Sequence, residues 1–225
     1  FNISYTYGGH AKQIALNAAP QADIDSLYPD VNDSPLLSLH YSGKIAILSI
    51  KTLDAGELKD AHIDFEGFLQ NSFSELKAKH IQSLILDLRG NGGGRDLYGA
   101  LLYSYIATKP FRYYQELDAA TRDLPYEEFK SSASSFNDLS PIMLDSMGPK
   151  RFRLDSAAHR NLEQMNPMPD AFHGKVFFLT DGLTFSAASE FCSLARTVQR
   201  GSFIGEETGG AYIGNTSAAE KDLLL

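Results

Sequence analysis

The chain has 225 residues, 43% of them hydrophobic and 11% aromatic, so it is long enough to bury a substantial core. Its formal net charge of −8 argues against a nucleic-acid partner, because that function needs a clustered basic face. The sequence contains no run of about 18 apolar residues, so it predicts no transmembrane segment.

Both ends of the sequence predict that it belongs to a longer protein. Phe1 is not an initiator Met and is not followed by the pattern of a signal peptide, and the chain stops at Leu225 without a closing element. The single Cys192 cannot form an internal disulfide, and we expect a buried structural thiol there. One cysteine does not identify the cellular compartment.

The first 30 residues predict the tail of a preceding β-rich module, with the main domain covering residues 31–225. A hairpin is expected over residues 1–20 around Gly8 and Gly9, followed by a polar linker at 21–35. A second hairpin over 36–50 precedes an apolar periodicity at 54–80, which predicts a long helix broken near Gly67. Residues 83–88 then predict a buried strand.

A glycine-rich turn follows this strand and leads into a predicted helix at 97–109. Three consecutive glycines, Gly92 to Gly94, are costly in backbone entropy unless the backbone must approach another group closely. Free amides in such a turn form an anion-binding concavity. The turn lacks the spacing of dinucleotide and Walker phosphate loops. An oxyanion hole and a plain tight turn both remain as interpretations.

Residues 109–172 are weakly patterned and predict an insertion. They are too many for a plain loop, so we expect helical pieces such as LPYEEF and a position as the wall or lid of a cleft. His159 lies in this insertion, and the sequence assigns it no role.

The stretch from Val176 to Phe191 predicts a strand, a turn and a helix. The apolar run 176–179 is typical of a short buried strand, and the helix carries apolar residues at helical spacing from Ala188 to Val198. Ser186 lies at the junction, where its hydroxyl could act as a nucleophile beside the free amide of Ala187. The alternative interpretation is that Ser186 only caps the helix. A further strand at 201–205 and a glycine-rich loop at 206–215 are expected to return to the same region.

Three motifs of this sequence resemble those of the carboxy-terminal processing (tail-specific) serine peptidases. They are LILDLRGNGGG (84–94), TFSAASEF (184–191) and GEETGG (205–210). The similarity covers residues 36–217 and is greatest to the branch of tricorn protease and interphotoreceptor retinoid-binding protein. It implies a crotonase/ClpP-like α/β core with a mixed β-sheet and flanking helices. This core would be preceded by the end of a PDZ-like or other small β module.

The resemblance also implies a site. Ser186 matches the nucleophile of the family, and the amides of Gly93 and Ala187 match its oxyanion donors; Gly92 and Thr208 are candidate supporting residues. The implied reaction is cleavage of a peptide bond through an acyl-enzyme, without a cofactor. The scattered His and Cys residues show no paired zinc spacing, so we expect no metal.

The general base of the family has no counterpart in this sequence. Ala211 stands where the processing branch has its Lys, and no Lys occurs between Ser186 and Lys221. In the tricorn-like branch the base is an upstream His, assisted by an acidic residue well downstream. We therefore expect the base to come from outside these 225 residues.

The sequence leaves two alternatives to the peptidase. One is a catalytically inactive module that binds peptides or an apolar ligand on the same fold. The other is crotonase-type acyl-CoA chemistry, which is disfavoured because it needs no Ser at a strand–helix junction. For the peptidase, the expected substrate is a peptide or an unfolded protein, and the resemblance implies a location in the cell envelope, periplasmic or secreted. The oligomeric state does not follow from the sequence.

Overall fold

The computed structural model describes residues 2–15, 20, 35–119, 144–148 and 151–214. The chain divides into two compact units, Phe1–Pro35 and Leu36–Leu225.

The described part of the first unit is a β-hairpin. Strands β1 (Asn2–Tyr7) and β2 (His10–Ala15) pair antiparallel. Gly8 and Gly9 connect them with φ values of 59° and 78°, the positive values that a two-residue hairpin turn of this kind requires. The predicted hairpin is therefore confirmed, whereas its assignment to a PDZ-like module stays a prediction.

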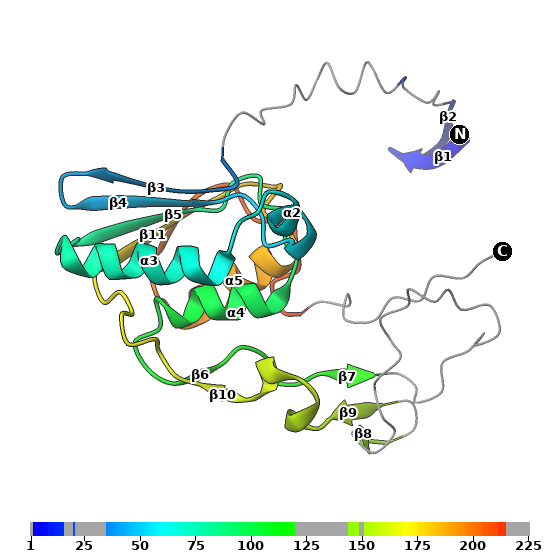
Figure 1. The fold of residues 1–225 in the computed structure, drawn as a ribbon. Coiled ribbons are helices and arrows are strands. Elements are labelled where there is room, and N and C mark those ends of the chain that lie inside the picture. The colour runs from blue at the N-terminus through cyan, green and yellow to red at the C-terminus, as the bar shows by residue number, and fades with distance from the viewer. Residues whose placement is uncertain (1, 16–19, 21–34, 120–143, 149–150, 215–225) are drawn as a thin grey trace. The chain divides into compact units, whose positions relative to one another are not determined.

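The second unit is built on a mixed β-sheet of five strands in the order β12-β11-β5-β4-β3 (Figure 1). Strands β4, β5, β11 and β12 are parallel, and β3 pairs antiparallel with β4. The bounds are β3 Leu37–Ser42, β4 Ile45–Ile50, β5 Ser83–Asp87, β11 Lys175–Thr180 and β12 Ser202–Gly205. This arrangement confirms the predicted α/β core with a mixed sheet and flanking helices.

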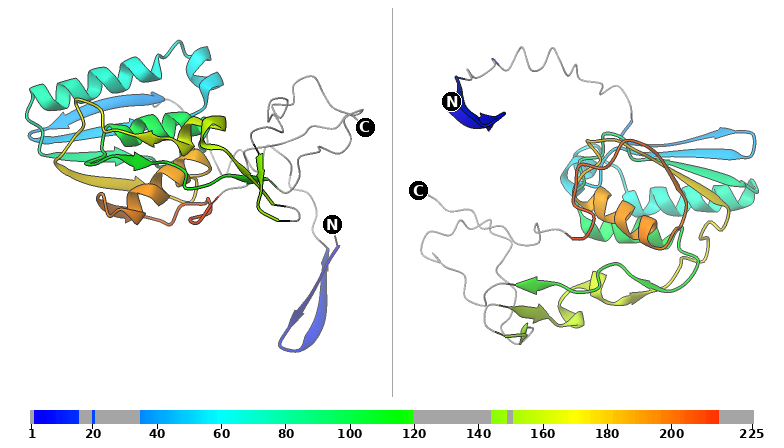
Figure 2. Two further views of the ribbon diagram at one scale, coloured as in Figure 1. Left: turned by 90° about the horizontal axis from the view of Figure 1, so that it is seen from below. Right: turned by 180° about the vertical axis from the view of Figure 1, so that it is seen from behind.

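The helices lie along one side of this sheet (Figures 1 and 2). They are α2 (Ala55–Asp60), α3 (Phe65–Ala78), α4 (Asp96–Ser104) and α5 (Ala187–Thr197). The strand residues that share the core with them alternate along each strand, as the period of a β-strand requires. Examples are Leu48, Leu86 and Phe178, each 0% exposed.

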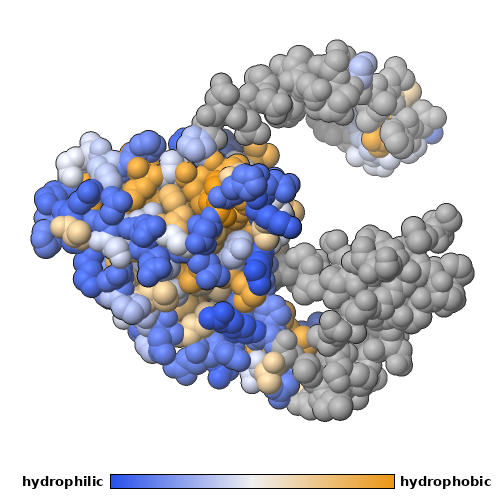
Figure 3. Space-filling model, in the orientation of Figure 1, coloured by the Kyte–Doolittle hydropathy of each residue, from blue (hydrophilic) through white to orange (hydrophobic). Residues whose placement is uncertain are grey.

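The residues between these core positions point to the other side of the sheet. Ile47, Ile85 and Phe177 lie in register on β4, β5 and β11, and each is only partly buried. In the view of Figure 3, hydrophobic residues of this unit reach the surface among hydrophilic ones. One side of the sheet is thus much better covered than the other within the described residues.

The helix predicted over 54–80 is two helices, and the predicted break near Gly67 is wrong. The chain leaves α2 through His62, whose φ is 56°, and Asp64 then caps α3 by accepting a hydrogen bond from the Gly67 amide at 3.1 Å. Gly67 therefore lies in the first turn of α3, and the break lies between Ala61 and Asp64.

The helix predicted over 97–109 ends early. Its last helical residue is Ser104, and the amides of Ile106 and Ala107 both bond to the Tyr103 carbonyl, which tightens and closes the last turn. Pro110 also disfavours a helical conformation for the residue before it.

The described part of the insertion contains short strands and 3₁₀ turns, so the expected helical pieces are wrong for these residues. Strands β6 and β10 form one antiparallel pair, and β7, β9 and β8 form a small separate sheet. The predicted LPYEEF piece at 124–129 lies outside the described residues. The bounds are β6 Phe111–Arg112, β7 Asp118–Ala119, β8 Leu144–Ser146, β9 Phe152–Leu154, β10 Gln164–Met165, η4 Ser156–Ala158 and η5 Arg160–Leu162.

Arg200 lies just after the end of α5 and connects segments of this unit that are distant in sequence. Its guanidinium donates hydrogen bonds to the carbonyls of Ile106, Phe172 and Gly174. These carbonyls lie after α4 and just before β11, so a single side chain joins three segments. Burial lowers the pKa of Arg200 from its ordinary value, and the three carbonyls supply the acceptors that a partly buried cation needs.

Candidate active site

The candidate site lies where β5 and β11 end. These neighbouring strands are parallel, so the loops at their carboxyl ends meet at one edge of the sheet. The Asp181 carboxylate, after β11, accepts a hydrogen bond from the Gly90 amide at 3.0 Å. The Thr184 hydroxyl donates to the Leu88 carbonyl at 2.9 Å. These side chains join the glycine-rich turn to the segment that leads into α5.

A charged cluster lies at the same edge of the sheet, where β5 ends. Asp87, the last residue of β5, accepts hydrogen bonds from the Arg89 guanidinium at 2.8 and 2.9 Å and from Lys51 at 3.2 Å. Burial acts to raise the pKa of Asp87, but the hydrogen bonds from Arg89 and the charge of Lys51 outweigh it and hold the pKa below its ordinary value. Asp87 is therefore an anion that anchors the start of the turn.

Ser186 is the residue immediately before α5, and its backbone is strained. Its φ and ψ are 48° and −127°, a combination that non-glycine residues rarely adopt. Residues held in such strained conformations cluster at active sites, so the strain favours a nucleophile at this position. Its side chain makes no capping hydrogen bond to the helix. The interpretation of Ser186 as a helix cap is therefore wrong for its side chain.

Gly93 packs directly on Ser186. A Cβ added at Gly93 would lie 2.6 Å from the Ser186 Cβ and 2.9 Å from the Ala187 nitrogen, closer than real Cβ contacts come. The φ of Gly93 is 98°, so this position needs glycine for its conformation as well. The structure thus brings together Ser186, Ala187 and Gly93. These are the predicted nucleophile and the residues of the two predicted oxyanion donors. Gly92 differs, because a Cβ added there would meet nothing within 4 Å.

The two predicted oxyanion donors differ in their present partners. The Ala187 amide lies in the first turn of α5 and has no acceptor among the described residues. The Gly93 amide is buried and donates to the Asn91 Oδ1 at 2.9 Å. The hydrogen bond from Gly93 to Asn91 was not predicted, although Asn side chains often accept from the amide two residues downstream.

The GEETGG loop returns to Ser186, as predicted. The Gly209 amide donates to the Thr184 carbonyl at 2.9 Å, and the Gly210 amide donates to the Ser189 Oγ at 3.2 Å. A Cβ added at Gly210 would lie 3.3 Å from the Ser186 nitrogen. The loop therefore packs against the first turn of α5 and against the backbone of Ser186.

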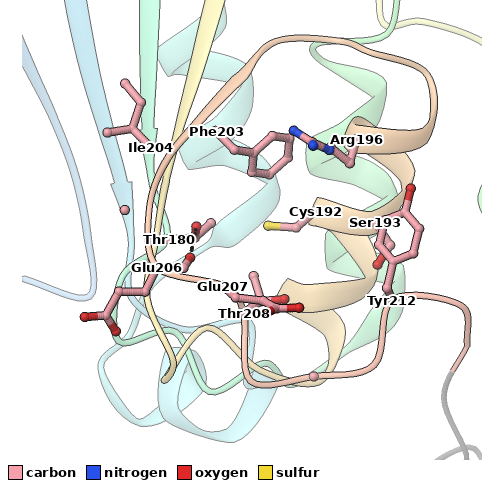
Figure 4. A pocket seen from close by; sticks show the side chains of 12 residues that line it. Thr180, Cys192, Ser193, Arg196, Phe203, Ile204, Glu206, Glu207, Thr208 and Tyr212 are labelled. Carbon is pink, nitrogen blue, oxygen red and sulfur yellow. Dashed lines mark hydrogen bonds between the residues drawn. The ribbon is translucent and has the colours of Figure 1, made fainter.

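A cavity of about 370 Å³ lies between this loop, β12 and α5 (Figure 4). Thr208, the predicted supporting residue, is among its lining residues, with Phe203 and Tyr212. The Cys192 sulfur points into the same space from α5 (Figure 4). Cys192 is 4% exposed, and burial raises the pKa of its thiol to about 12. Cys192 is therefore buried, as expected from the sequence, and its thiol is neutral.

A second polar cluster lies one helical turn along α5 from Ser186, and no motif of the sequence predicted it. The Tyr114 hydroxyl lies 2.7 Å from the Glu190 Oε2 and 3.0 Å from the Asp96 Oδ2. Asn161 donates to the same Asp96 oxygen at 2.9 Å. Burial and then the charge of Asp96 raise the pKa of Glu190, although the hydrogen bond from Tyr114 opposes them.

His159 belongs to this cluster and is not placed to act as a base. Its Nδ1 accepts from the Asn161 amide at 3.2 Å, and its Nε2 lies 3.4 Å from the Asp96 Oδ2. Both ring nitrogens are thus occupied. No hydrogen bond joins the Ser186 hydroxyl to a His, Lys, Asp or Glu side chain in the described part of the chain.

The comparisons with known proteins give a family. The model of peptidase family S41 matches residues 44–222, whereas no curated protein matches the chain. Among solved structures, a putative peptidase from Parabacteroides merdae is 18% identical and matches 84% of this chain and 50% of its own, with a TM-score of 0.47. A mutant of CPAF is 14% identical and matches 82% of this chain and 43% of its own, with a TM-score of 0.50.

A photosystem II D1 C-terminal processing protease is 17% identical and matches 73% of this chain and 31% of its own, with a TM-score of 0.42. The chain thus spans half or less of each of these three structures. The CPAF mutant, with a TM-score of 0.50, shows a similar fold only, whereas the family model covers most of the sequence. The chain belongs to peptidase family S41.

Proposed function

We propose that this chain forms the core of a serine endopeptidase in which Ser186 is the nucleophile. The observation that carries the proposal is the strained backbone of Ser186 at the start of α5, with Gly93 packed directly against it. Strain of this kind is retained where a function needs it. The proposed oxyanion donors are the amides of Ala187 and Gly93, with Gly92 and Thr208 in supporting positions.

The proposed reaction is acyl transfer in two halves. The Ser186 Oγ forms a bond to the carbonyl carbon of the substrate while its proton passes to the base, and the carbonyl π electrons move onto the oxygen. Collapse of this tetrahedral oxyanion breaks the C–N bond, and the leaving amine takes the proton from the base. Water then repeats the sequence on the ester and releases the acid and the free Ser186.

The base is proposed to be an imidazole from outside these 225 residues. Three observations support this assignment. Ala211 stands at the Lys position of the processing branch, both nitrogens of His159 are engaged, and no described basic side chain bonds to the Ser186 hydroxyl. An acidic residue that orients the base would come from outside the chain as well.

Membership of the family implies a peptide or protein substrate, and we propose an unfolded or extended segment, because the site needs access to the backbone of the substrate. Within the described residues, no helix is long and apolar enough to cross a membrane. We propose a location in the cell envelope and, for residues 1–30, a role as the tail of a preceding β module. Both proposals depend on the resemblance of the motifs.

The test is labelling with a fluorophosphonate probe, which reacts only with an activated serine. The complete protein that contains this chain would be compared with its Ser186→Ala variant and with Ser193→Ala, a matched control on the same helix. We expect labelling of the wild type and the control and none of Ser186→Ala. A folded wild type that does not label would contradict the peptidase and favour the inactive binding module.

A further inference from the structure

We infer that Asn91 is a positioning residue for acyl transfer at Ser186, and that its carboxamide holds the Gly93 amide for the oxyanion. The inference deepens the proposed function and depends on it. Asn91 lies between the end of β5 and the triple glycine, and it is 0% exposed. Nothing in its spacing from Ser186 marks it as part of the site.

All four polar groups of Asn91 are used. Its Nδ2 donates to the Ile50 carbonyl at the end of β4, and its Oδ1 accepts from the Gly93 amide, both at 2.9 Å. Its own amide donates to the Leu88 carbonyl at 3.1 Å, and its carbonyl accepts from the Phe185 amide at 2.9 Å. One residue therefore ties together β4, the glycine turn and the residue that precedes Ser186.

These contacts set the distance between the two halves of the site. The bond to Phe185 fixes the backbone that leads into the strained Ser186, and the bond to Gly93 fixes the turn that faces it. A carboxamide is suited to this position because it offers a donor and an acceptor on one planar group. An Asp side chain would place a carboxylate oxygen against the Ile50 carbonyl, and Leu would satisfy neither group.

The bond to Gly93 also explains how a buried donor is kept available. A buried N–H without an acceptor destabilises the fold, and the Asn91 Oδ1 removes that cost. A charged oxyanion is a stronger acceptor than a neutral carboxamide, so it can take over the Gly93 N–H as charge develops. The Gly93 carbonyl accepts a hydrogen bond from the Leu53 amide at 2.8 Å, which holds the peptide after Gly93 in place while the acceptor of its N–H changes.

A residue that acts in this way affects the transition state more than substrate binding. Removal of the Asn91 side chain should therefore lower kcat and leave KM almost unchanged. Removal of a purely structural side chain would instead lower the fraction of folded enzyme. The matched control is Arg200→Met, because Arg200 bonds three carbonyls near the other end of α5 and has no contact with Ser186.

The experiment measures fluorophosphonate labelling and cleavage of fluorescein-labelled casein by the complete protein. The amplitude of labelling gives the folded fraction, and its rate constant reports on the site. For Asn91→Ala we expect a rate constant lower by up to about 100-fold, the effect of losing one oxyanion donor, because the Gly93 amide is no longer held in place. We expect kcat on casein to fall in parallel and KM to stay unchanged. For Arg200→Met we expect a lower Tm and an unchanged rate constant.

The outcomes separate the two proposals. If the wild type labels and Asn91→Ala labels at the same rate, the inference on Asn91 is overturned while the proposed function stands. If the wild type does not label at all, both are overturned.

A measurement on the wild type covers the case in which Asn91→Ala does not fold. The amide proton resonance of Gly93, observed by NMR before and after phosphonylation of Ser186, should shift strongly because its acceptor changes from the carboxamide to the phosphoryl oxygen. A resonance that does not move would overturn the inference.

Discussion

At the scale of single residues, Ser186 has a strained backbone conformation, which we relate to its proposed role as the nucleophile. Glycine adopts a φ of 48° without the steric cost that a Cβ imposes. We therefore expect Ser186→Gly to raise the free energy of unfolding by about 1 kcal/mol relative to Ser186→Ala, which keeps the Cβ. Urea unfolding of both variants measures the difference, and neither should label with the fluorophosphonate. A Gly variant no more stable than the Ala variant would show that the strain is not significant.

Substitution of Gly93 should lower stability, in contrast to Ser186→Gly. An added Cβ would collide with Ser186 and would also have to adopt a φ of 98°. We expect Gly93→Ala to lower the free energy of unfolding by about 2 kcal/mol or more. Gly92→Ala is the matched control for stability, because an added Cβ there meets nothing within 4 Å. Thermal unfolding of the two variants checks the prediction, and equal losses would contradict it.

Much of the site could be predicted at this scale, because serine at a strand–helix junction and consecutive glycines leave a visible sequence pattern. The hydrogen bond from the Gly93 amide to the Asn91 Oδ1 was not predicted, because an Asn two residues before a glycine does not by itself show that such a contact forms. The cluster around Asp96 could not be predicted either. Its members come from α4, α5 and the insertion, which meet only in the folded chain, and they lie up to 94 positions apart in the sequence, from Asp96 to Glu190.

At the scale of elements, three helices end with a non-glycine residue in the left-handed conformation. His62, His80 and Gln199 have φ values of 56°, 51° and 54°, and each forms the hydrogen bonds of a Schellman motif. We expect His80→Gly to raise the free energy of unfolding by about 0.5 to 1 kcal/mol. Lys79→Gly is the control, because Lys79 has a φ of −83° and should lose stability. Urea unfolding of the two variants measures the difference, and a His80→Gly variant no more stable than the wild type would contradict the prediction.

The contact between α5 and the insertion predicts a pH dependence. Burial and the charge of Asp96 raise the pKa of Glu190 above its ordinary value of 4.5, so the folded state holds the proton more tightly than the unfolded state. Stability from this group is present at low pH and is lost as pH rises from about 4.5 through the raised pKa.

Glu190→Gln should remove this loss, so the stability of the variant relative to the wild type should increase with pH. The groups that face Glu190 are the Tyr114 hydroxyl and the Asp96 carboxylate, with the buried Tyr113 nearby. Both proteins would be unfolded in urea at intervals from pH 4 to pH 8. A constant difference between them would contradict the assignment to Glu190.

Element types in the core were predictable because each strand and helix buries a periodic set of apolar residues. The break between α2 and α3 was predicted at the wrong position, because the apolar pattern continues across it and does not show that Asp64 caps the second helix. The strands of the insertion were missed for another reason. Pieces of two or three residues, such as Gln164–Met165, carry no period and exist only through their tertiary pairing.

At the scale of the whole molecule, the order of the strands creates the site. Strands β5 and β11 are far apart in sequence yet pair along their full length, from Lys175 opposite Ser83 to Leu179 opposite Asp87. The sequence predicted both strands and their buried character. Their adjacency followed only from the resemblance, because periodicity says nothing about which strands pair.

This pairing has a further consequence, since each half of the site belongs to a different part of the sequence. The part up to residue 119 carries β5 and Gly93, and the part from residue 144 carries β11 and Ser186. If the chain were divided between these positions, neither polypeptide would hold both the nucleophile and the turn that faces it. Labelling of Ser186 would then occur only after the two pieces had found each other, and the probe would act as a sensor of their complementation. Mixing the separately produced pieces, with a Gly93→Ala piece for comparison, would show whether labelling follows their association.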